Sequence, residues 1–543
     1  MWKKIKEFLP SKKSSSTVNL SMDRTTISDK VDVANAFNTF FCNIGSEIGK
    51  TFDDSLPKVD SFVSGNRYVI PSITPDFVLT EIKQMAAGKA TGIDGISVKL
   101  LKLADGEDFS TGYIPVVAFT QGQTAHMNLT QGEILNYNKL ITNIHSVIDA
   151  NGVFTANTAG LYAFHFYSLT KVNTELWLEI MLNGNLVASA YAHSSGTGGY
   201  ADAGNSVILE LSRGDMVYIK AHDQYQNIMF GTRDQIYTTF TGVMIDSGYF
   251  EHESLNRNNP TGFSVGLDHH QTITNGSNIP FDVDIMNRSR EAGYNFTTHE
   301  FVSPHEGLYI FHFHALSEAN NKIWIELFNN DQYVVAAYAF TSNEYGDAGN
   351  TAILHLMQND HVTVKARPGN DVEMFGSPTG VYATFSGALL SLSLPRTETP
   401  ETDFEEMAFT VGLTRDANVP AYSKVPFDRL YTNFGNGFDM NRDVFTAKIH
   451  GVYIFQFHGL SQNGQVLYLD LYHNYKYITS AYAFDANSFS AGSNTAALTL
   501  MAGDEVYVSV RGTSKLFGSH DEVYCTFSGY LVAPLNQYQP IVG

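Results

Sequence analysis

The sequence repeats one pattern three times, and this repetition limits what the chain can fold into more than any other feature. Gly160–Phe166 (GLYAFHF) recurs as Gly307–Phe313 (GLYIFHF) and as Gly451–Phe457 (GVYIFQF), at spacings of 147 and 144 residues. Each copy later contains a turn and a strand-like run, and closes on a Thr-Phe-Thr/Ser-Gly segment. A unit of this length is too long for a solenoid repeat and can bury its own core, so the three copies are predicted to be domains.

Within each unit the apolar residues alternate with a period of two. Tyr453, Phe455 and Phe457 point to one side of the predicted strand, whereas Ile454 and Gln456 point to the other. The sequence therefore predicts a strand with an aromatic face in the core. Many short strands separated by turn residues, without a convincing amphipathic helix in the repeats, predict an all-β fold of the sandwich or jelly-roll type.

The third unit carries a pattern of eight residues at fixed spacing. These are Phe427, Asn433, Phe438, Phe445, Gly451, Tyr453, Phe455 and Phe457. In this pattern, and in the closing segment Thr526–Leu531, the chain resembles the complement C1q globular-head (C1q domain) family. The resemblance covers residues 114–246, 260–393 and 405–534, which are the three expected domains.

The first two units depart from the full pattern. The second keeps Tyr294 and Phe301, but the spacing before Tyr294 is two residues longer. The first keeps Phe154 but has Val147 where the pattern has an aromatic residue. These departures leave the fold prediction intact and concern only the early part of each unit.

The resemblance implies a ten-stranded jelly roll like that of tumour necrosis factor, which the family assembles as a trimer. It also implies non-enzymatic ligand binding, as in the soluble innate immune recognition proteins of invertebrates, although no collagen-like Gly-x-y period occurs here. The linkers at 246–260 and 394–406 could join neighbouring heads around a threefold axis. One hypothesis is that a single chain forms a pseudo-trimer; the alternative is that heads from different chains trimerise.

The charge of the chain is unevenly distributed. Residues 1–104 carry a net charge of +3 and the remainder −24, in a chain of 543 residues with a net charge of −21. The acidic repeats argue against general nucleic-acid binding, which needs a basic surface, and are compatible with cationic partners or calcium. The start of the chain lacks the pattern of a secretory signal, and no run of apolar residues is long enough to span a membrane. The expected location is nevertheless extracellular, because the family resemblance implies it.

Residues 1–104 lie outside the repeat and are expected to form a mostly helical extension after a disordered start. Helical spacing is followed by Val33, Phe37, Phe40, Phe41, Ile44 and Ile48. Together with the run from Gly88 to Ile96, this region resembles the segment that precedes the polymerase domain of a non-long-terminal-repeat retroelement reverse transcriptase. The metal-binding aspartates of that family lie downstream of this segment, where this chain has already entered its first repeat. A fusion remnant and a wrong gene start both explain such a fragment.

Two acidic segments are candidate metal ligands. Asp202-Ala203-Gly204-Asn205 and Asp347-Ala348-Gly349-Asn350 resemble in position the acidic loop that some family members use for calcium, whose preferred ligands are oxygens. The third copy has Ser490-Ala491-Gly492 there, without the acid. Alternatively, Asp and Gly serve the geometry of a turn. His165, His312 and His314 are interpreted as strand residues, because Gln456 replaces the first two in the third copy.

The sequence shows no cluster of nucleophile, histidine and carboxylate, so the chain is predicted not to be an enzyme. The preferred hypothesis is a multivalent recognition protein whose partners are its own domains and a microbial surface or protein ligand. The rival hypotheses are a structural or matrix-type oligomer that binds its own kind, and a retroelement-derived nucleic-acid protein, which the acidic repeats oppose.

Overall fold

The computed structural model describes residues 116–194, 200–223, 227–246, 261–288, 293–340, 345–369, 371–392 and 406–535, and two short strands near the start of the chain. The chain divides into two compact units, Met1–Gly112 and Tyr113–Gly543. In the first, β1 (Leu20–Met22) pairs antiparallel with β2 (Thr25–Ile27). The predicted helices of this unit, and its likeness to a reverse transcriptase, fall on residues outside those described. Among the described residues no helix could cross a membrane.

The first repeat forms two five-stranded antiparallel sheets and a two-stranded pair. One sheet has the order β11 (Asp202–Leu211), β8 (Gly160–Leu169), β14 (Thr239–Asp246), β3 (Ala118–Gly122) and β5 (Lys139–Ile144). The other has the order β10 (Asn185–His193), β9 (Glu175–Leu182), β12 (Met216–Ala221), β7 (Phe154–Thr155) and β6 (Val147–Ile148). The pair is β13 (Asn227–Met229) with β4 (Met127–Leu129).

The second repeat has the same strand order. One sheet has the order β23 (Asp347–Leu356), β20 (Gly307–Leu316), β26 (Ala383–Leu392), β15 (Gly262–Leu267) and β17 (Val283–Arg288). The other has the order β22 (Gln332–Phe340), β21 (Lys322–Asn329), β24 (His361–Ala366), β19 (Glu300–Val302) and β18 (Tyr294–Asn295). The two-stranded pair is β25 (Val372–Met374) with β16 (Gln271–Ile273).

The third repeat again follows this order. One sheet has the order β35 (Ala491–Leu500), β32 (Gly451–Leu460), β38 (Thr526–Pro534), β27 (Ala408–Gly412) and β29 (Arg429–Phe434). The other has the order β34 (Lys476–Phe484), β33 (Val466–His473), β36 (Glu505–Val510), β31 (Val444–Thr446) and β30 (Phe438–Asp439). The pair is β37 (Ser514–Leu516) with β28 (Ala417–Val419). The all-β prediction is confirmed: each repeat is a sandwich of ten strands with an added pair. We call them the first, second and third sandwich.

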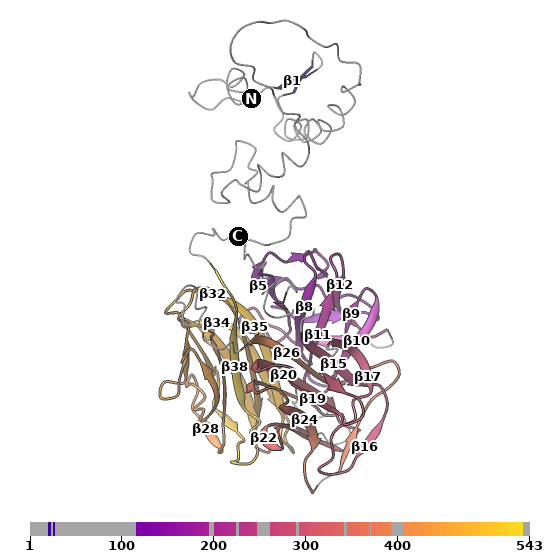
Figure 1. The fold of residues 1–543 in the computed structure, drawn as a ribbon, viewed down its shortest axis with the longest axis vertical. Coiled ribbons are helices and arrows are strands. Elements are labelled where there is room, and N and C mark those ends of the chain that lie inside the picture. The colour runs from indigo at the N-terminus through magenta and orange to yellow at the C-terminus, as the bar shows by residue number, and fades with distance from the viewer. Residues whose placement is uncertain are drawn as a thin grey trace, which may run out of the picture. The chain divides into compact units, whose positions relative to one another are not determined.

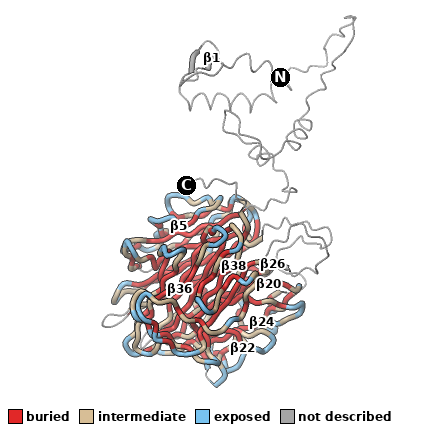
Figure 2. Tube along the Cα trace, turned by 90° about the vertical axis from the view of Figure 1, so that its left-hand side faces the viewer, coloured by how far each residue is buried: buried red, intermediate tan, exposed pale blue. Residues whose placement is uncertain are grey.

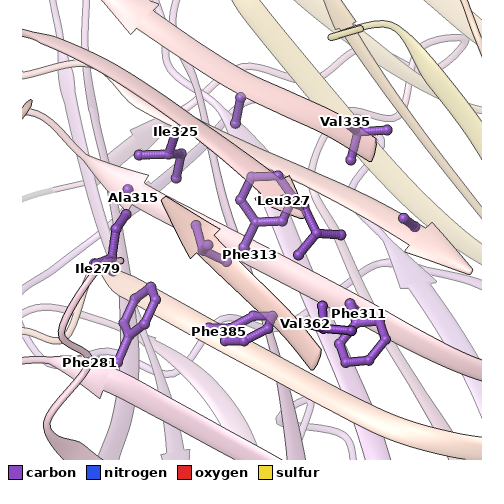
Figure 3. Close-up of a cluster of buried hydrophobic side chains, with 14 of the residues drawn as sticks. Ile279, Phe281, Phe311, Phe313, Ala315, Ile325, Leu327, Val335, Val362 and Phe385 are labelled. Atoms are coloured by element: carbon purple, nitrogen blue, oxygen red, sulfur yellow. The ribbon is translucent and has the colours of Figure 1, made fainter. Parts of the chain in front are cut away.

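The aromatic face predicted for the central strand lies in the core of each sandwich. In the second sandwich, Phe311 and Phe313 of β20 pack with Phe385 of β26 and with Ile325 and Leu327 of β21, which lie on the two facing sheets (Figure 3). Tyr453, Phe455 and Phe457 occupy the same position in the third sandwich. Buried residues follow the strands, whereas the exposed ones gather at the turns (Figure 2). The alternation in the sequence therefore identified the core face correctly.

The prediction for Val147 was wrong in register. In the first sandwich Phe154 pairs with Ile148, as Phe445 pairs with Phe438 in the third. Ile148 packs on the core, whereas Val147 is 50% exposed. Shifting a strand by one residue exchanges its two faces, so the position of the missing aromatic residue is filled by Ile148.

The opposite face of each central strand is also buried, which the sequence analysis had not predicted. Ala163 of β8, Ile310 of β20 and Ile454 of β32 belong to one hydrophobic cluster to which all three sandwiches contribute. We call this cluster the inter-domain core. Its buried members are Val116, Ala118, Leu161, Ala163, Ile208, Val243, Met286, Leu308, Ile310, Ile353, Ala388, Ala408, Val452, Ile454, Ala497, Tyr530 and Ala533. The sandwiches therefore share a core as well as having their own.

The three sandwiches contact one another in a closed cycle. Nδ2 of Asn205 in the first sandwich donates to the carbonyl of Tyr382 in the second (3.1 Å). The corresponding Asn350 donates to Tyr524 in the third (3.2 Å), and Asn494 donates to Tyr237 in the first (3.0 Å). A head-to-tail contact that closes after three steps is a ring with a pseudo-threefold axis. In this structure one chain thus forms the whole ring.

We predict that the inter-domain core stabilises the chain as strongly as a sandwich core. Ile310→Ala should lower the free energy of unfolding by about 2–5 kcal/mol, because it removes a fully buried side chain between sandwiches. Chemical denaturation of the full chain measures this value. Leu140→Ala, at a position that is 55% exposed, is the control and should change stability by no more than about 0.5 kcal/mol. A change that small for Ile310→Ala would contradict the shared core.

Candidate functional site

The central strands place a layer of polar side chains near the pseudo-threefold axis. His165, His312 and Gln456 hold the same position on β8, β20 and β32, and all three are buried. The rings of His165 and His312 lie 4.8 Å apart between centroids, and Nε2 of Gln456 lies 3.2 Å from Nε2 of His165. Residues from three separate domains therefore meet in one layer.

A second layer follows two residues further along each strand, at Tyr167, His314 and His458. Hydroxyl groups link the layers: Ser206 Oγ is 2.8 Å from Nδ1 of His165 and 3.3 Å from Nε2 of His314. Thr351 Oγ1 bridges His312 and His458 in the same way. Burial lowers the pKa of His165 and of His314 to about 3, so both imidazoles are neutral at physiological pH.

The interpretation of the strand histidines as structural residues fits this geometry. The Nδ1 atoms of His165, His312 and His458 each have a hydroxyl partner at 2.8 or 2.9 Å. A buried polar side chain is stable when it is hydrogen-bonded, and these Nδ1 atoms are. Within the described residues, Nε2 of His312 and Oε1 of Gln456 have no hydrogen-bond partner. The role of the three histidines in the structure is to join neighbouring sandwiches through a hydrogen-bond network.

Next to the second layer, a small pocket contains both predicted acidic residues. Asp202 begins β11 and Asp347 begins β23, and both line this axial pocket together with Tyr167 and His314. The remaining lining residues are Gly204, Ala348, Gly349, Ala491, Gly492 and Ser493. The structure thus brings together two residues that are 145 positions apart in the sequence.

Each carboxylate of the axial pocket reaches into a neighbouring sandwich. Oδ2 of Asp202 accepts a hydrogen bond from the backbone N–H of Ser493 (2.8 Å), and Oδ2 of Asp347 accepts one from Gly204 (3.2 Å). The alternative that these acids serve a local turn is therefore wrong, since they stand at strand starts and bond across domains. Ala491 takes the corresponding place in the third sandwich, where no carboxylate is available.

Burial makes these carboxylates unusual acids. It raises the pKa of Asp202 well above its ordinary value, and the nearby Asp347 raises it further, against the lowering effect of the Ser493 N–H. Burial likewise raises the pKa of Asp347. Two buried carboxylates in one pocket need either a proton or a cation to balance their charge.

The axial pocket offers some of the oxygen ligands that calcium prefers. Calcium takes 6–8 oxygen ligands, and carboxylates are the strongest of these. Asp202 and Asp347 each use one oxygen in the backbone bond and retain a second, and Tyr167 adds a hydroxyl to the lining. These groups supply fewer oxygens than the six to eight that calcium takes, so the lining provides only part of a calcium shell.

One cluster of possible ligands was missed by the sequence analysis. Asp268, His269 and Asp282 have ligand atoms within 4.8 Å of one another, on the surface of the second sandwich. Asp282 is distant in sequence from the other two, so no local pattern could reveal it. The corresponding place in the third sandwich holds an ion pair between Arg415 and Asp428 (3.2 Å). The cluster is therefore a surface group of one histidine and two acids at a position where the third sandwich has an ion pair.

The described residues offer no sign of an activated thiol. Cys525, just before β38, is buried, and burial raises the pKa of its thiol to about 12. Since the thiolate is the reactive form, this cysteine is inert.

Comparison with protein-family models identifies the sandwiches. The model of the C1q domain matches residues 118–245, 262–390 and 408–532, which is more than half of the chain. The chain belongs to the C1q domain family. Each match lies within one sandwich, so the three repeats are three C1q domains, and the family resemblance of the third unit extends to all of them.

Individual C1q relatives match shorter stretches. Caprin-2 of Danio rerio is 34% identical over 184 residues, which are 30% of this chain and 20% of that protein. Complement C1q tumor necrosis factor-related protein 3 of Mus musculus is 35% identical over 112 residues, 20% of this chain and 45% of that protein. The chain thus spans less than half the length of these curated relatives. The solved globular domain of zebrafish complement 1qA matches 24% of this chain and 100% of its own length, with 26% identity and a TM-score of 0.21.

We predict that the pH dependence of stability reports the buried acids of the axial pocket. Because the pKa of both carboxyls is raised in the folded state, their contribution to stability falls as the pH rises above about 4, the ordinary pKa of an unfolded Asp. In the presence of chelator, the double variant D202N/D347N should therefore gain melting temperature relative to the parent between pH 5 and pH 8. Calorimetry at pH 5 and at pH 8 measures the melting temperatures of variant and parent. The same difference between the two proteins at both pH values would contradict the prediction.

Proposed function

We propose that this chain is a non-enzymatic, multivalent binding protein that acts outside the cell in innate immune recognition of microbial surfaces. The observation that supports this proposal is the closed ring of three C1q domains, which presents three non-identical heads in a fixed arrangement. C1q domains are ligand-binding modules. Loops at the ends of such sandwiches are free for contact, because the strands are occupied by the two cores.

The ring also disfavours the rival hypothesis of a matrix-type oligomer. The contact through which Asn205, Asn350 and Asn494 join the domains is used three times within the chain and closes on itself. A closed head-to-tail cycle leaves no copy of that contact for another chain. Self-assembly would therefore need a different surface. The nucleic-acid hypothesis remains opposed by the acidic C1q domains.

We predict that the full chain is a single-chain ring that binds by avidity. Light scattering should give the mass of one chain, and a threefold mass would contradict the ring. Apparent affinity for an immobilised microbial cell-wall preparation, which displays ligands for all three heads, should exceed that for a soluble monovalent fragment of one ligand by roughly 10²–10⁴-fold, because linked heads raise each other's effective concentration. Surface plasmon resonance at decreasing ligand density measures this effect. Equal affinity in both formats would contradict multivalent binding.

We further propose that calcium binds the axial pocket between Asp202 and Asp347. At 100 times its dissociation constant, calcium should stabilise the folded chain by about 2.7 kcal/mol, and chelator should reverse this. D202N/D347N should abolish the response, whereas D268N, on the surface of the second sandwich, should retain it. Thermal unfolding with calcium and with chelator makes the comparison. An unchanged response in D202N/D347N would exclude the axial pocket.

A further inference from the structure

The third domain holds a tyrosine in a turn where the other domains have smaller residues. Asn474 and Tyr475 connect β33 to β34, with φ of +45° and +65°. The same two-residue turn is Asn183-Gly184 in the first domain and Asn330-Asp331 in the second, also with positive φ at every position. A hairpin of this kind favours Asn followed by Gly, because a side chain at positive φ is strained. Tyr is therefore a costly choice at position 475.

A second tyrosine repeats this anomaly in the same domain, at the other end of β36: Asn474 donates to Glu505 and Tyr422 to Val510, the first and last residues of that strand. Tyr422 has φ of +63°, and the corresponding residues are Gly132 and Gly276, with φ of +70° and +74°. Their equivalence is visible in the hydrogen bonds, because the N–H of Tyr422 donates to Val510 as that of Gly276 donates to Ala366. Two glycine positions of the common fold have thus been replaced by tyrosine in one domain.

Packing within the domain does not compensate for this strain. Tyr422 is 79% exposed and Tyr475 is 80% exposed, the highest values among the exposed large apolar residues of the described chain. A Cβ added at Gly184 or Gly276 would meet nothing within 4 Å, so these positions project into open space. A strained residue that gains little inside the molecule is a sign of a role outside it.

Tyr475 belongs to a continuous aromatic group on the third domain. The rings of Tyr472 and Tyr507 are stacked, with centroids 5.4 Å apart and an interplanar angle of 9°, and Tyr475 lies 6.3 Å from Tyr507. Nζ of Lys424, two residues after Tyr422, lies 4.9 Å from the centre of the Tyr507 ring. Tyr507 itself is only 8% exposed and lies beneath this group. We call the exposed Tyr422 and Tyr475, together with Lys424, Tyr472 and the underlying Tyr507, the tyrosine surface.

The other two domains lack this group. Tyr472 corresponds to Met181 and Phe328, and Lys424 corresponds to Ile134 and Asn278. Tyr507 corresponds to Tyr218 in the first domain but to Thr363 in the second. The tyrosine surface is therefore a property of one head and not of the fold.

The chemistry of the tyrosine surface suits a sugar. Tyrosine offers a flat apolar ring with a polar hydroxyl at its edge, and a pyranose ring likewise has an apolar C–H face and hydroxyl edges. Lys424 and an ion pair of Arg442 with Glu505 (2.6 Å) supply hydrogen-bonding groups beside the rings. Both signs of charge are present, so a strongly anionic ligand is not favoured. Tyr507 is only 8% exposed and Nζ of Lys424 lies 4.9 Å from its ring centre, so this ring offers no free face to a small organic cation.

The extent of the surface suits a chain of sugars better than a single one. On one side of β36, the backbone of Lys424 forms an isolated β-bridge with Ser509. On the other side, Tyr472 of β33 pairs with Tyr507. Neighbouring strands lie about 4.7–4.9 Å apart, so these three segments span about 10 Å across the sheet, and the five steps from Glu505 to Val510 separate the two tyrosine turns by about 17 Å along it. We propose that the tyrosine surface of the third domain is a binding site for neutral polysaccharide, which names the ligand class of one head and rests on the proposed function.

The test uses the full chain and affinity electrophoresis in gels that contain laminarin, yeast mannan or galactan. At least one of these neutral polysaccharides should retard the parent chain. Y422G/Y475G should weaken that binding by at least tenfold, as loss of exposed aromatic contacts does, while its melting temperature stays unchanged or rises because the strain is relieved. D331G is the matched control, since it changes the same turn position in the second domain and should leave binding unchanged. Y475F retains the ring and should retain most of the binding.

Two results would overturn the proposal. The first is a parent chain that none of the three polysaccharides retards, including the case in which only a protein ligand is bound. The second is full binding by Y422G/Y475G. Either result leaves the single-chain ring in place, because its test is the mass of the chain. Conversely, a threefold mass would refute the ring without changing what the tyrosine variants show.

Discussion

The burial of β8, β20 and β32 on both faces is the constraint on which the rest of the structure depends. Each strand directs its aromatic residues into its own sandwich and its small or aliphatic residues, such as Ala163, Ile310 and Ile454, into the inter-domain core. A strand with two buried faces cannot remain at the surface of an isolated domain without exposing apolar area to water. The sandwiches therefore require one another, and the ring follows from the composition of three strands.

Hydrogen bonds give this association its geometry. The amides of Asn205, Asn350 and Asn494 each join two sandwiches, and a threonine hydroxyl from the neighbouring sandwich donates to each of their oxygens at 2.6 Å. Apolar contact alone would allow the sandwiches to slide, whereas a buried amide that loses its partners costs about 1–3 kcal/mol. The repeated asparagine therefore fixes the rotation of each sandwich against the next, and with it the position of the axial pocket.

The sequence was sufficient to predict the sandwiches and their aromatic cores, because alternation and turn residues are local signals. It could not show that the strand face with Ile454 and Gln456 is also buried. An apolar residue in the sequence is consistent with burial inside one sandwich and with burial between two sandwiches. Asp202 and Asp347 were recognised from their loops, but their meeting depends on the ring and on no spacing within the sequence. Ile148, and not Val147, packs on the core because the pairing between strands sets their register, which the spacing of the sequence did not show. Tyr422 and Tyr475 are present in the sequence, but only the backbone conformation showed that they occupy positions where a glycine is favoured.

Placing all three heads on one chain removes a restriction that governs symmetric trimers. In a homotrimer every residue near the axis occurs three times, so a substitution there changes three neighbours at once. In this chain the layer of His165 and His312 is completed by Gln456, and the pair of Asp202 and Asp347 by Ala491. A single mutation therefore changes the axial residue of one domain, while the corresponding residues of the other two domains keep their packing. The residues along the axis can thus change one at a time during evolution.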